Sequence, residues 1–100
     1  MVILHLSESL KVSARWNDDG QLEIHGQDLK PPTAFGGEYE YWFVIPKDQL
    51  HLVASDIGAD RSDGDAFLEH LAAQGSRIVA TGEGKWLKSL GVTAKFTSWF

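Results

Sequence analysis

Residues 10–27 read LKVSARWNDDGQLEIHGQ, and this stretch indicates the class of fold. Residues 10–16 alternate apolar and polar side chains, and residues 21–27 do the same. A period of two is typical of a strand with one face in the core. Between the two runs, Asn17-Asp18-Asp19-Gly20 ends in a glycine that suits a turn with positive φ. The stretch therefore predicts a β-hairpin and, with it, an antiparallel sheet.

More strands are expected on either side of this hairpin. Residues 38–45 (EYEYWFVI) alternate as well, with three aromatic rings on one face and two acids and a tryptophan on the other. The closing stretch, residues 92–100, is rich in Thr, Val and aromatic residues, which favours a strand. Residues 1–6 either extend the first strand or form their own. Residues 28–37 contain two prolines and two glycines and are expected to form a loop.

Helices are predicted between the last two strands. Residues 47–57 place Leu50, Val53, Ala54 and Ile57 on one helical face, and a glycine follows as a stop signal. A second helix is expected from Ser62 or Asp63 to Gly75, and a third, short one from a Thr81 cap to Gly91. The prediction is one α+β domain over residues 1–100. Two or three helices pack on one face of an antiparallel sheet of three to five strands.

The composition limits the function classes. A chain of 100 residues with 43% hydrophobic and 23% charged residues is expected to fold as a single domain. It has no cysteine, which excludes disulfides and thiolate metal sites and favours a reducing compartment. Residues 1–6 carry no basic leader, and no run approaches the ~18 apolar residues of a membrane span. We therefore expect a soluble cytoplasmic protein.

The net charge of −5 opposes binding to nucleic acids or anionic membranes and would assist association with a basic protein. The charge is concentrated between Asp56 and Glu69, where five acids accompany one base, Arg61. These acids are candidate partner-binding residues: Asp56, Asp60, Asp63, Asp65 and Glu69. The alternative interpretation of this segment is helix capping and solubility.

A second candidate patch consists of Glu38, Glu40 and Trp42, which share one face of the strand at 38–45. Tryptophan beside acids is typical of protein interfaces. The four tryptophans could equally fill a small core, and for most of them this is the simpler interpretation.

No catalytic constellation, metal site or cofactor site is recognisable. The histidines show no metal-ligand spacing, and His25 and His70 are expected to be solvated; the four are His5, His25, His51 and His70. Residues 60–65 fail as a calcium loop, because aligning their glycine places Ala59 and His70 at ligand positions that need acids. Residues 82–86 lack the pattern of a phosphate loop. One alternative stays open, a small metal-dependent hydrolase that uses His51, His70 and nearby acids.

The chain resembles small acidic bacterial immunity proteins of contact-dependent or polymorphic toxin systems. The resemblance rests on size, acidity, lack of cysteine, the order of elements, and the segments GQDL (26–29), EYEY (38–41) and SWF (98–100). It implies neutralisation of a cognate toxin, often a basic nuclease, by covering the active site or an essential surface, and it assigns no residue roles. A different class also fits the sequence: a non-catalytic adaptor or homo-oligomeric domain that uses residues 92–100 as an exposed edge strand.

Overall fold

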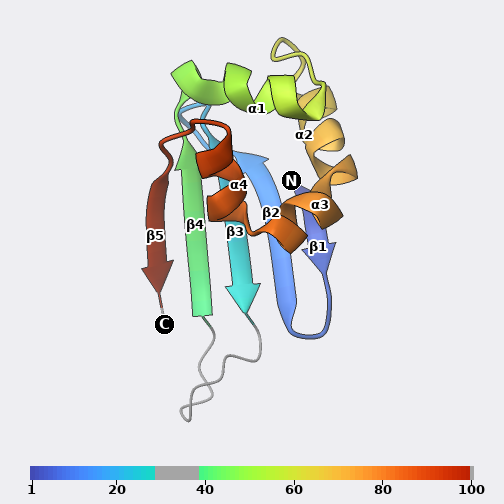
Figure 1. Cartoon of the computed structure of the whole chain (residues 1–100), viewed down its shortest axis with the longest axis vertical. Coiled ribbons are helices and arrows are strands. Elements are labelled where there is room, and N and C mark those ends of the chain that lie inside the picture. The colour runs from blue at the N-terminus through green and yellow to red at the C-terminus, as the bar shows by residue number, and fades with distance from the viewer. Residues whose placement is uncertain (29–38, 100) are drawn as a thin grey trace.

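The computed structural model describes residues 1–28 and 39–99 and contains a five-stranded sheet. The strands lie side by side in chain order, and every neighbouring pair is antiparallel (Figure 1). Their bounds are β1 (Val2–Leu6), β2 (Leu10–Trp16), β3 (Leu22–Asp28), β4 (Tyr39–Ile45) and β5 (Lys95–Trp99). The α+β class and the antiparallel sheet are thus confirmed, and residues 1–6 form a strand of their own. The predicted loop lies almost entirely outside the described residues.

The hairpin of β2 and β3 forms at the predicted turn. Val12 lies opposite Gly26 and Ala14 opposite Ile24, so the alternating apolar residues share one face. In the turn, the Asn17 side-chain oxygen accepts hydrogen bonds from the backbone N–H groups of Asp19 and Gln21, at 3.0 and 2.9 Å. Gly20 has a φ of 73°, which only glycine adopts without strain. Local turn chemistry therefore sets the register of the central sheet.

The helices lie on one face of the sheet, and their most extensive contacts with strands are those with β1 and β2 (Figure 1). A 3₁₀ turn, η1 (Lys47–Gln49), precedes α1 (Leu50–Ile57), and α2 (Gly64–Ala73), α3 (Gly75–Thr81) and α4 (Glu83–Ser89) follow. Gly58 ends α1 in the left-handed conformation at φ 71°. Asp63 caps α2, since its carboxylate accepts the Ala66 N–H at 3.1 Å. The sequence predicted the stop at Gly58 and a helix start near Asp63.

The described residues form four α-helices, so the expected two or three is wrong. The error arises at Gly75, which was interpreted as the end of a helix but is the first residue of α3. A Cβ at Gly75 would lie 2.8 Å from the carbonyl carbon and 2.9 Å from the Cα of Leu4, well inside contact distance. Glycine is therefore required by the close approach of α3 to β1, and not by helix termination.

The start of the last helix is also corrected. Thr81 was predicted to cap it, but Thr81 is the last residue of α3. Gly82 occupies the N-cap of α4 with a φ of 96° and offers no side-chain cap. A positive φ at this position lets the chain turn between two adjoining helices.

The core lies between the helices and the β2–β3 face of the sheet. Its fully buried side chains include Val12, Leu22 and Ile24 from the strands and Phe67, Leu71 and Ile78 from the helices. The edge strand β5 is exposed along its whole length. Phe96 and Trp99 on that strand are 52% and 61% exposed. Within the described ranges, no helix combines the length and the apolar character that a membrane span requires.

Candidate protein-binding surfaces

The predicted acidic segment runs from the end of α1, through the connection, into the first half of α2. All five acids lie on exposed residues. We refer to the four that form no ion pair within the described chain as the acidic surface: Asp60, Asp63, Asp65 and Glu69. Asp65 and Glu69 are four residues apart on α2 and therefore lie on the same side of that helix. Arg61, also exposed, lies in the same segment. Four of the five predicted acids are thus exposed along the connection between α1 and α2 and the first half of α2.

Asp56 has a different environment from the other four acids. Its Oδ2 accepts a hydrogen bond from Arg77 Nη2 of α3 at 2.6 Å and one from Trp86 Nε1 of α4 at 3.0 Å. The Arg77 hydrogen bond, with that of Trp86, holds the pKa of Asp56 below its ordinary value. Its side chain is only 23% exposed. Asp56 therefore joins three helices, and its charge is balanced by Arg77.

Two acids of the acidic surface accept backbone hydrogen bonds. Asp60 accepts the Ser62 N–H at 2.8 Å, and this bond lowers the pKa of Asp60. Asp63 caps α2 through its carboxylate. A cap satisfies a backbone donor but brings no compensating cation. Among residues 1–28 and 39–99, none of the four carboxylates lies within ion-pair distance of a basic side chain.

The second predicted patch lies on the sheet face that the helices leave open. Glu38 lies outside the described residues. Trp42 stacks on His25 with ring centroids 4.9 Å apart and planes 2° from parallel. Glu40 Oε1 accepts a hydrogen bond from Gln27 Nε2 at 3.0 Å and lies 3.6 Å from His25 Nε2. Glu40 and Trp42 are thus half-buried in a network along β3 and β4.

His25 differs from its expected solvated state. Its Nε2 atom is buried and has no hydrogen-bond partner among the described residues. His70 is exposed, as expected.

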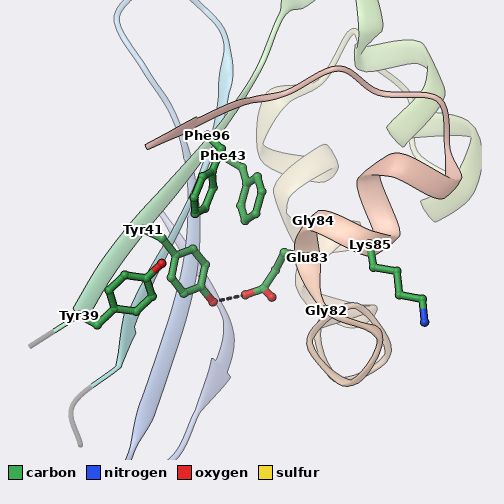
Figure 2. Close-up of a pocket in the computed structure, with 8 residues that line it drawn as sticks. All are labelled: Tyr39, Tyr41, Phe43, Gly82, Glu83, Gly84, Lys85 and Phe96. Carbon is green, nitrogen blue, oxygen red and sulfur yellow. Dashed lines mark hydrogen bonds between the residues drawn. The ribbon is translucent and has the colours of Figure 1, made fainter. Parts of the chain in front are cut away.

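An aromatic hollow between the β4–β5 edge and the start of α4 was not predicted. It has a volume of about 270 Å³. Four rings form one side, those of Tyr39, Tyr41, Phe43 and Phe96, and residues 82–85 form the other (Figure 2). The Phe43 and Phe96 centroids are 4.9 Å apart, and Tyr41 lies 5.9 Å from Phe43. These rings lie on the helix side of the sheet, since Phe43 pairs with Ile24 of the core face.

Glu83 places a carboxylate against these rings. The residue is 8% exposed, and its Oε1 accepts a hydrogen bond from the Tyr41 hydroxyl at 2.5 Å (Figure 2). Burial and the Glu83 carboxylate raise the pKa of Tyr41 far above its usual range. The Tyr41 ring lies over Gly26 on the neighbouring strand, where any Cβ would clash with it. The tyrosine hydroxyl is therefore held in place as a donor to Glu83.

Part of the signal for this hollow is present in the sequence. The alternation of residues 39–43 places three rings on one strand face, but it identifies neither the partner strand nor a helix beside it. Residues 82–84, Gly-Glu-Gly, indicate from the sequence only the start of the helix that is predicted to follow Thr81. The pairing of β4 with β5 and the position of α4 bring Phe96 and Glu83 to these rings.

Two further observations concern the function: the arrangement of possible metal ligands and the comparison with known proteins. Among the described residues, no group of three or more His, Asp or Glu side chains is arranged to hold a metal ion. His51 and His70 are both exposed, on α1 and α2. No protein-family model, curated protein or solved structure matches the chain.

Proposed function

We propose that this protein is a non-catalytic binding protein that neutralises a basic protein partner, in the way that an immunity protein neutralises its cognate toxin. The observation that supports the proposal is the acidic surface. Four exposed carboxylates and one base, Arg61, leave a local charge of −3, and no ion pair within the described chain offsets it. Such a protein would act in the cytoplasm, where a toxin reaches its target.

Neutralisation would proceed by occlusion. The acidic surface attracts a cationic protein and accelerates the encounter, by about 10–10³-fold at low salt in strongly steered pairs. Once docked, its carboxylates occupy positions where a nuclease would hold substrate phosphates. Asp65 and Glu69 are the strongest candidates for direct contact, because both are exposed and neither caps a helix through its side chain. Asp56 contributes by holding α1 against α3 and α4.

The test is co-expression with the product of the neighbouring gene, followed by purification and a toxicity assay. Complex formation and loss of toxicity are expected. The double variant D65N/E69Q should slow association several-fold at low salt, and the effect should shrink at physiological salt. D48N is the matched control, because Asp48 is an exposed acid on η1, outside the acidic surface. A neighbouring product that is harmless, or that this protein neither binds nor neutralises, would refute the proposal.

A second candidate function is self-assembly through β5. One observation favours it: β5 is an edge strand, exposed throughout, and carries the exposed rings of Phe96 and Trp99. An exposed edge presents unpaired backbone donors and acceptors that a second strand can join. Size-exclusion chromatography with light scattering distinguishes the two functions. A monomer at micromolar concentration would eliminate self-assembly, whereas a stable dimer would favour it.

A further inference from the structure

The aromatic hollow combines two features that are favourable for a cation. The first is a wall of four rings, whose faces attract positive charge when a cation lies within about 6 Å of the ring centroid. The second is the Glu83 carboxylate on the opposite side, which is nearly buried. Burying a carboxylate costs free energy unless hydrogen bonds and an opposite charge compensate for it.

In the described part of the chain, no cation provides this compensation. Glu83 takes part in no ion pair there, and its hydrogen bond comes from the neutral Tyr41 hydroxyl. Lys85 lines the hollow, but its side chain points away from Glu83 (Figure 2). Burial, and after it the Glu83 carboxylate, raises the pKa of Tyr41, so this hydroxyl stays a neutral donor. The hollow is therefore suited to a positive group that comes from outside the described chain.

The size of the hollow limits this group. A volume of about 270 Å³ is slightly below the range of about 300–1,000 Å³ for drug-sized pockets, so it admits one long side chain or a small organic cation. One Glu83 oxygen is already bound to Tyr41, which disfavours the two-pronged pairing that a guanidinium prefers. An ammonium needs a single acceptor, and its methylene chain packs well against aromatic rings.

We propose that the hollow binds a lysine side chain of the partner protein, with the ammonium at Glu83 and the methylene chain against Tyr41, Phe43 and Phe96. This inference rests on the proposed function, because it presumes a basic protein partner. The hollow and the core lie on the same side of the sheet, the side that carries the helices. The lysine would thus anchor a partner that approaches the helical side of the molecule.

The experiment is an NMR titration of the intact protein that follows the backbone amides of Gly82, Gly84 and Phe96. Three probes are compared: N-acetyl-lysine methylamide, its uncharged analogue N-acetyl-norleucine methylamide, which lacks the ammonium group, and choline. The lysine probe is expected to shift these amides with a millimolar Kd, and the norleucine probe to bind about tenfold more weakly or less. Choline is expected to bind more weakly than the lysine probe, since it has no ammonium hydrogens for Glu83.

Variants locate the effect at the hollow. E83Q preserves the shape of the side chain and an acceptor for Tyr41 but removes the charge, and should weaken the lysine probe about tenfold. F96L, at a position that is 52% exposed, should weaken it several-fold without disturbing the core. D48N is the control, since it removes one negative charge from an exposed residue on η1 that does not line the hollow, and it should leave the Kd unchanged.

Several results would overturn the inference: no shift with the lysine probe, equal binding of the norleucine probe, an equal effect of D48N and E83Q, or tighter binding of choline. Because the probes are small molecules, each of these failures leaves the acidic surface and the neutralisation of a partner intact. Conversely, a harmless neighbouring gene product would refute the proposed function without changing the titration.

Discussion

Replacement of Gly75 by alanine is expected to destabilise the protein, although it improves helix propensity. A new Cβ at this position would overlap the backbone carbonyl of Leu4 on β1. This neighbour is backbone within the sheet, so it cannot move aside as the end of a side chain could. The clash must be relieved by shifting α3 away from β1, which loosens the packing of Ile78, a fully buried residue on the same helix.

The magnitude follows from two opposing contributions. Overpacking a close contact costs about 1–3 kcal/mol, and a backbone neighbour places this site near the upper value. Replacing glycine by alanine within a helix raises the free energy of unfolding by about 1 kcal/mol through helix propensity. The net effect is a loss of about 2 kcal/mol of unfolding free energy. In a domain of this size that corresponds to a decrease in Tm of about 10 °C.

The assay is urea unfolding followed by tryptophan fluorescence, with thermal unfolding as a second measurement. G84A is the matched control, because Gly84 also lies within a helix but its nearest neighbour is the edge of the Phe43 ring, at 3.1 Å. That ring can move by a few tenths of an ångström, so G84A should change stability by less than about 1 kcal/mol. A G75A protein as stable as the unsubstituted one, or more stable, would refute the close-packing argument.

Three further outcomes are expected. First, because the folded-state pKa of Asp56 lies below its ordinary 3.8, the stability from its bond with Arg77 is present in full above that value. This stability is lost as the pH falls through the pKa of Asp56 in the folded state. The free energy of unfolding of D56N should therefore differ most from that of the unsubstituted protein at neutral pH and least in acid, as measured by urea unfolding across pH. Second, D56A should cost about 1–3 kcal/mol in thermal unfolding at pH 7, because it removes the acceptor of the Trp86 indole N–H; D56N, which keeps an acceptor, should cost less. Third, Y41F should destabilise the protein by a similar amount, since it leaves the buried Glu83 carboxylate without its hydrogen-bond donor. In a double-mutant cycle with E83Q, the loss of unfolding free energy caused by Y41F should be smaller in the E83Q background.

The elements that could be predicted from the sequence are those specified by local interactions. The alternation of residues 10–16 and 21–27 and the turn at 17–20 predicted a hairpin that the structure contains with the expected faces. Gly58 ends α1 and Asp63 caps α2, because a left-handed residue and an N-cap act on neighbouring backbone groups. Such signals are contained within a few residues and can be interpreted without knowledge of the fold.

The elements that could not be predicted depend on contacts between segments distant in the chain. In the sequence, Gly75 resembles a helix stop. In the structure, it allows the close packing of α3 against β1. The five acids of residues 56–69 are visible in the sequence, but only the packing of α1 against α3 shows that Arg77 balances Asp56. The aromatic hollow likewise needs β5 beside β4.

The sequence by itself therefore determined the class of fold, the central hairpin and the location of most of the negative charge. The tertiary structure alone decided which acids remain unpaired, which strand forms the exposed edge and where a buried carboxylate meets four rings. The physical reason is the range of the interactions involved. Turns, caps and alternation act between residues close in the chain, whereas ion pairs, close helix–strand contacts and cavities arise only when distant segments are packed together.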